Sequence, residues 1–131
     1  MAILQDKIQP NTYMECRIID HRVDALEGSQ LFLRYVHLEK VTHELYFGWT
    51  NRIVHACIHM LQHFPLPQYE GYFSHFEKHL EIKWNTDEAN DSYILHFLDQ
   101  GTIMTIQAKK EQLIPFGHQL EKEWHQSPVV E

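Results

Sequence analysis

The sequence predicts an α+β fold in which an antiparallel sheet of about five or six strands carries two helices packed on one face. Several short stretches alternate apolar and polar residues, which is typical of strands. Residues 50–64 and 110–125 instead carry apolar residues at helical spacing. The connections between the predicted strands are short, so neighbouring strands are expected to be antiparallel.

The first part of the chain is expected to supply three strands. Residues 1–12 are polar and include Pro10, so they are predicted to form a loose lead-in, and residues 24–30 are predicted to form a turn. The predicted strands are residues 13–20, 31–38 and 41–47. In the first strand, Met14, Cys16 and Ile18 share one side. In the second strand, the alternation places Phe32, Val36 and Leu38 on one face and Leu33, Tyr35 and His37 on the other.

Residues 50–64 form the most strongly patterned stretch, and we expect the remaining chain to pack around this helix. Thr50 or Asn51 can cap its start, and Pro65 with Pro67 ends it. Its apolar stripe consists of Ile53, Val54, Cys57, Ile58, Met60, Leu61 and Phe64. The opposite side consists of Arg52, His55, His59, Gln62 and His63.

The second part of the chain is expected to add three strands and a closing helix. After a Pro-rich loop, a strand is predicted from Phe76 to Trp84, followed by a polar loop at residues 85–92. Two further strands, residues 93–98 and 102–108, flank a hairpin signal at residues 99–101. In the helix at 110–125, Pro115 either opens the first turn or produces a kink. Residues 126–131 are predicted to fray.

Length and composition indicate a single domain over residues 1–131. The formal charge is −7, because 18 Asp and Glu outnumber 11 Lys and Arg. Such a surface repels phosphate backbones and therefore argues against nucleic acid as a partner. It suits a basic protein, since charge complementarity accelerates encounter. The N-terminus does not resemble a signal peptide, and no apolar stretch of about 18 residues exists, so we expect a cytoplasmic protein without a membrane partner.

The 11 histidines are candidate metal ligands, but their spacing predicts no metal site. His55, His59 and His63 lie on one helix face, where adjacent pairs can chelate a transition metal. One ion cannot use all three, because residues eight apart span about 12 Å of helix axis. His75, Glu77 and His79 share a strand face, and the outer two would lie about 13 Å apart.

Catalytic motifs are also missing from the sequence. His43-Glu44 begins an HExxH pattern, but Phe47 stands where the second histidine is required. No CxxC, GxSxG or Gly-rich phosphate loop is present. Cys57 falls on the apolar helix stripe and Cys16 in a strand, so both are expected to be buried free thiols rather than nucleophiles. We therefore predict no catalytic residues and no cofactor.

Two loops offer candidate contacts for a protein partner. The loop at 85–92 concentrates three carboxylates, Asp87, Glu88 and Asp91. It is either a solvated hairpin loop or an acidic surface for a basic partner. Tyr69 and Tyr72 lie in or next to the Pro-rich loop and can serve as anchors, because interfaces favour tyrosine.

The order of elements resembles that of a known family. The chain contains H-E-L-Y-F-G-W, the helix R-I-V-H-A-C-I-H-M-L, F-E-K-H-L-E-I, a hairpin and the closing L-I-P-F-G-H-Q-L helix. This pattern, over about residues 41–124, is similar to the WapI-like immunity proteins of bacterial polymorphic toxin systems. The resemblance implies a protein that binds and blocks a toxin, often a nuclease, and that is not an enzyme. It assigns no functional residues.

The sequence thus favours a non-enzymatic cytosolic binding protein that neutralises or sequesters a protein partner, and the resemblance implies that this partner is a toxin, which the acidic charge predicts to be basic. The alternative is a small ligand- or metal-binding domain that uses the histidine-rich surface. An enzyme ranks third, because no catalytic spacing was found.

Overall fold

The computed structural model describes residues 1–24, 27–74 and 80–130, and it confirms the α+β class. The chain forms two antiparallel four-stranded sheets rather than the single sheet of about five or six strands that the sequence predicts. The division follows from the chain order, because a helix separates the fourth strand from the fifth. Each half of the chain therefore consists of four consecutive antiparallel strands followed by one helix.

The first sheet, called sheet A, has the order β1-β2-β3-β4. Its strands are β1 (Ala2–Gln5), β2 (Thr12–His21), β3 (Gly28–His37) and β4 (Lys40–Thr50). Met14, Cys16 and Ile18 are buried together, as predicted. In β3 the predicted faces are wrong, because Leu33 and Val36 are both buried. A register shift between Tyr35 and Val36 interrupts the alternation, and a simple period of two cannot anticipate it.

Residues at both ends of the chain are more ordered than predicted. Within the lead-in, β1 pairs with β2 and buries Ala2 and Leu4 completely, which explains why a short apolar strand forms there. The N-terminal ammonium group lies 2.6 Å from the carboxylate of Glu123. In the C-terminal segment, Val129 forms a parallel bridge with His21. Both ends are thus held by the fold.

The second sheet, called sheet B, has the order β5-β6-β7-β8. Its strands are β5 (Tyr72–Ser74), β6 (Glu81–Asp87), β7 (Ser92–Asp99) and β8 (Thr102–Ala108). The start of the strand predicted from Phe76 falls on residues 75–79, outside the described residues. At its other end β6 continues to Asp87, into the predicted loop. The hairpin at residues 99–101 is confirmed, with positive φ at Gln100 and Gly101 as a type I′ turn requires.

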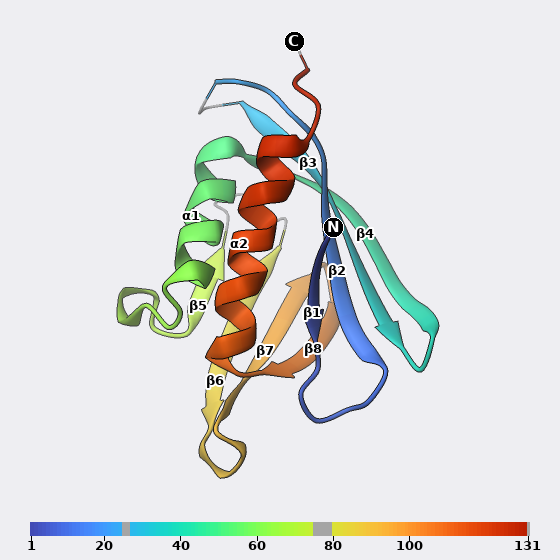
Figure 1. The fold of residues 1–131 in the computed structure, drawn as a ribbon, viewed down its shortest axis with the longest axis vertical. Helices are drawn as coiled ribbons and strands as arrows, with labels where there is room; N and C mark the ends of the chain where they lie inside the picture. The colour runs from blue at the N-terminus through green and yellow to red at the C-terminus, as the bar shows by residue number, and fades with distance from the viewer. Residues whose placement is uncertain (25–26, 75–79, 131) are drawn as a thin grey trace.

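The two helices lie side by side and pack against each other on one side of the sheets (Figure 1). Helix α1 (Asn51–Gln62) begins after Thr50, whose hydroxyl accepts the Ile53 N–H at 3.3 Å, which confirms the predicted cap. Helix α2 (Lys110–Gln126) places Pro115 inside the helix, so this proline does not open it. Within the described residues, neither helix is long and apolar enough to span a bilayer.

The apolar core fills the space between the helices and the inner faces of both sheets. Its most buried side chains include Met60 of α1, Leu113 of α2, Leu4 of β1 and Leu95 of β7. Because the helices cover one side, the opposite faces of the sheets remain open to solvent. These outer faces carry the exposed aromatic and charged side chains.

Candidate functional site

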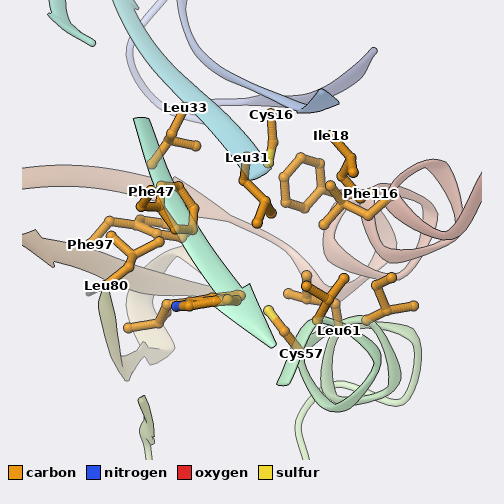
Figure 2. A pocket seen from close by; sticks show the side chains of 15 residues that line it. Cys16, Ile18, Leu31, Leu33, Phe47, Cys57, Leu61, Leu80, Phe97 and Phe116 are labelled. Atoms are coloured by element: carbon orange, nitrogen blue, oxygen red, sulfur yellow. The ribbon is translucent and has the colours of Figure 1, made fainter. Parts of the chain in front are cut away.

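The core encloses one small apolar cavity of about 40 Å³, lined by side chains from both sheets and both helices (Figure 2). Cys16 and Cys57 lie on different sides of it. The indole N–H of Trp49, which also lines the cavity, is buried without a hydrogen-bond partner among the described residues. An engineered apolar cavity that binds benzene has a volume of about 150 Å³. The cavity is therefore too small for an organic ligand.

The two cysteines are free and buried, as predicted. Burial raises the pKa of the Cys16 thiol to about 12. Burial likewise raises the pKa of the Cys57 thiol, and the neighbouring Cys16 adds to this effect. Because the thiolate is the reactive form, neither side chain is suited to nucleophilic attack near neutral pH.

The three histidines of the α1 surface do not act as one group. His59 and His63 lie close together, with ring centroids 4.4 Å apart. His55 instead packs edge-on against Trp124 at 4.4 Å. Across residues 1–24, 27–74 and 80–130, no group of three or more His, Cys, Asp or Glu is arranged to hold a metal ion. His75, Glu77 and His79 lie outside the described residues.

A polar network that the sequence did not indicate joins β2 to the C-terminal segment. His21 stacks on Trp124 with ring centroids 4.0 Å apart, and its Nδ1 lies 2.6 Å from Ser127 Oγ. The Ser127 hydroxyl donates to the Trp124 carbonyl, so the imidazole N–H is the donor to Ser127. Burial, followed by repulsion from His125, lowers the pKa of His21. This arrangement holds the C-terminal segment against β2. Both hydrogen bonds of Ser127 serve to position that segment.

The acidic loop is a tight hairpin in which one carboxylate has a structural function. Asp87 accepts hydrogen bonds from Gln107 Nε2 at 2.7 Å and Asn90 Nδ2 at 2.8 Å. These hydrogen bonds, from Asn90 first and then from Gln107, lower the pKa of Asp87. The Lys7 ammonium donates to the Asn90 carbonyl, so a cation also lies at this hairpin. The exposed carboxylates that remain here are Glu88 and Asp91.

The two predicted tyrosine anchors differ in environment. Tyr69 is partly buried against the core and packs edge-on against Phe73 at 5.5 Å. Tyr72 is exposed, and the Lys83 ammonium lies 5.7 Å from its ring centroid. Lys83 is directly opposite Tyr72 in the sheet and four residues before Asp87. The tyrosine is therefore about 13 Å along the strand from the acidic hairpin.

The outer face of sheet A carries an aromatic and charged cluster that the sequence analysis did not select. Tyr46 is 69% exposed, although such aromatics usually belong to the core. Its ring lies 4.7 Å from that of Phe32, which is directly opposite on β3. The Arg34 guanidinium lies 5.2 Å from the Phe32 ring. The exposure of Tyr46 was predictable from the alternation of the strand, since adjacent residues point to opposite faces and Phe47 is buried.

A depression of about 400 Å³ adjoins Tyr46 where β4 meets the β7–β8 hairpin. It is lined by Gln30, Tyr46, Phe47, Gly48, Asp99 and Gln100. The sequence pattern indicates the hairpin at residues 99–101, but it carries no information that the hairpin lies beside β4. The depression is thus lined by residues that carry aromatic rings, a carboxylate and two side-chain amides.

Comparison with protein-family models, with curated proteins and with solved structures finds no match for this chain. The similarity to WapI-like immunity proteins therefore remains a prediction from the order of elements and apolar spacing.

Proposed function

We propose that this chain is a non-enzymatic protein that binds a basic protein partner. The observation that carries the proposal is the formal charge of −7 on a fold whose outer sheet faces remain open. Carboxylates on such a surface attract a basic partner and accelerate its association. Aromatic and arginine side chains on the same surface, such as Tyr46 and Arg34, are the residue types that contribute most to protein interfaces.

The proposed role is neutralisation of a toxin domain, as the resemblance to immunity proteins implies. A toxin that acts on nucleic acid is expected to be basic, because it must bind phosphate groups. An acidic partner can cover such a surface and exclude its substrate. This role accounts for an acidic binding protein that has no catalytic motif.

The test measures binding between the purified chain and the protein encoded by the adjacent gene. Surface plasmon resonance at low and moderate salt gives both rate constants. We expect tight binding, with an association rate that falls as salt screens the charges. Absence of binding, in a sample shown to be folded by circular dichroism, would refute the proposal.

The acidic hairpin offers one contact surface that the same assay can examine. Replacing Glu88 with Gln and Asp91 with Asn is expected to slow association if these side chains lie at the rim of the interface. If one carboxylate is buried in the complex, its loss is expected to cost about 2–5 kcal/mol, mainly through faster dissociation. Asp87→Asn is a less direct probe, because Asp87 also receives the Gln107 and Asn90 hydrogen bonds.

The alternative function is metal or small-ligand binding on the histidine-rich face of α1. The observation in its favour is the adjacency of His59 and His63, since two histidines one helical turn apart can bind a transition metal. Elemental analysis of protein purified without an affinity tag tests it. One zinc per chain, lost in His59→Ala, would support this function over partner binding.

A further inference from the structure

We propose that the depression beside Tyr46 binds an arginine or lysine side chain of the partner. This inference rests on the proposed function for the identity of the partner and adds the position and chemistry of one contact. The site lies at the junction of the two sheets, between the edge strand β4 and the turn that connects β7 with β8.

The chemistry of the lining suits a cation. Tyr46 packs one part of its ring on Phe32 and leaves most of its surface accessible, so a guanidinium or ammonium group can lie over the ring. The Asp99 carboxylate can pair with the same cation from the hairpin side. The amide oxygens of Gln30 and Gln100 can accept its remaining N–H groups.

The charges around the depression also favour a cation. Arg34 lies between Glu15 and Glu44, at 3.7 Å and 3.3 Å, so its charge is balanced within the sheet. Glu44 lies two residues before Tyr46 on the same face of β4. Arg17 is opposite Phe32 on β2, two strands from Tyr46, or about 10 Å away. Among these described residues, Asp99, Glu15 and Glu44 carry three negative charges against the two positive charges of Arg34 and Arg17, so the balance favours a cation.

Gly48 leaves the necessary space. A Cβ at this position would meet Gln30 Nε2 at 3.6 Å and the Ser29 carbonyl oxygen at 3.7 Å, which are ordinary contacts. Among the described residues, the packing around Gly48 therefore leaves room for a methyl group. Glycine within a strand often marks a place where a ligand or another chain approaches closely. Gly48 lines the depression, so its missing side chain widens the site for an incoming group.

The corresponding depression on sheet B is less suited to a cation. It is lined by Tyr72 and Lys83 together with Glu70, Trp84, Asn85 and His96. Here the Lys83 ammonium already lies over the Tyr72 ring. An incoming cation would meet this positive charge, so the Tyr46 depression is the favoured site.

The test uses N-acetyl-arginine amide as the probe and N-acetyl-citrulline amide as its uncharged counterpart. Proton–nitrogen correlation spectra record which backbone amide signals move during each titration. We expect the arginine probe to shift the signals of Gly48, Asp99 and Gln100, and the citrulline probe to leave them in place. Shifts spread evenly over the acidic surface, or no shifts, would overturn the proposal.

Variants then test the named contacts. We expect Asp99→Asn and Tyr46→Leu each to raise the dissociation constant of the arginine probe about threefold to fivefold, the range for an exposed ion pair or cation–π contact. Gly48→Ala, which the packing accommodates, is expected to weaken it as well. Asp91→Asn is the matched control, because it removes the same charge from the other hairpin of sheet B and its φ of 48° is tolerated by asparagine. Equal weakening by Asp91→Asn and Asp99→Asn would refute a specific site.

Binding of the adjacent gene product separates this inference from the proposed function. Slower association or faster dissociation with Asp99→Asn, whatever the effect of Asp91→Asn at the separate acidic hairpin, supports both. Unchanged partner binding by Asp99→Asn, Tyr46→Leu and Gly48→Ala refutes the depression and leaves the proposed function intact. A localised arginine site in a chain that binds no protein partner refutes the proposed function alone.

Discussion

Gly117 of α2 lies against Leu61 and Gln62 of α1, and its replacement by alanine tests this packing. A Cβ at this position would lie 2.9 Å from Gln62 N and 2.9 Å from Leu61 Cβ. Neither atom can move away by rotation of a side chain, since one is backbone and the other is attached directly to it. The Gly117→Ala variant can therefore fold only if the two helices shift apart.

The expected magnitude combines two opposing effects. In an open helix interior, Gly→Ala stabilises by about 1 kcal/mol. Overpacking in a filled site costs about 1–3 kcal/mol, and two such short contacts indicate the upper part of that range. We therefore expect Gly117→Ala to lower the free energy of unfolding by about 1–2 kcal/mol. For a chain of this length, that corresponds to a fall in Tm of roughly 3–10 °C.

Urea denaturation followed by circular dichroism measures the change in unfolding free energy. Gly48→Ala is the control, because its added methyl group makes contacts of ordinary length and should leave stability about unchanged. The reasoning is refuted if Gly117→Ala is more stable than the wild type by the amount expected for an open helix site. That result would mean that the helices do not approach closely at Gly117.

Three further predictions concern buried groups. Because burial raises the thiol pKa of Cys16 and Cys57, neither should react rapidly with iodoacetamide near pH 8 in the folded chain, and both should react in denaturant; fast alkylation of the native chain would contradict this. The folded-state pKa of His21 lies below its unfolded value of about 6.5, so folding favours the neutral ring. The stability that the neutral His21 ring contributes should be present above about pH 6.5 and be lost as pH falls through the lower folded pKa. If the urea midpoint of His21→Gln falls with decreasing pH as much as that of the wild type, His21 is not the group responsible. Asn51 is buried and connects the Ser29 hydroxyl to the Asp24 carbonyl, so Asn51→Ala should destabilise by about 1–3 kcal/mol in urea titrations, and a negligible change would show that these groups find other partners.

Patterns among neighbouring residues predict those elements that are set by interactions within one helix, turn or strand. Helix α1 was predicted because its apolar residues recur at helical spacing and Thr50 provides an N-terminal cap. The turn at Gln100 and Gly101 is recognisable because glycine adopts positive φ at no steric cost, and both turn residues have positive φ. The burial of Met14, Cys16 and Ile18 followed from alternation along one strand.

Features that depend on contacts between distant residues were not predictable. Strand β1 is only four residues long, and it is recognisable only from its pairing with β2 and the complete burial of Ala2 and Leu4. The register shift in β3 depends on its partner strand. A strict alternation therefore places Leu33 and Val36 on opposite faces, whereas the shift between Tyr35 and Val36 lets both be buried. Asp87 was expected as a surface charge, yet its partner Gln107 lies 20 residues away.

The sequence by itself determined the fold class, the helix positions, the acidic charge and the absence of recognisable catalytic motifs. Only the tertiary structure decided that the strands divide into two sheets and that Tyr46 is exposed beside Asp99. The reason is that spacing along the chain records which face a side chain occupies within its own element. It does not record which element lies opposite, and the depression beside Tyr46 exists because β4 meets a hairpin about 50 residues further along the chain.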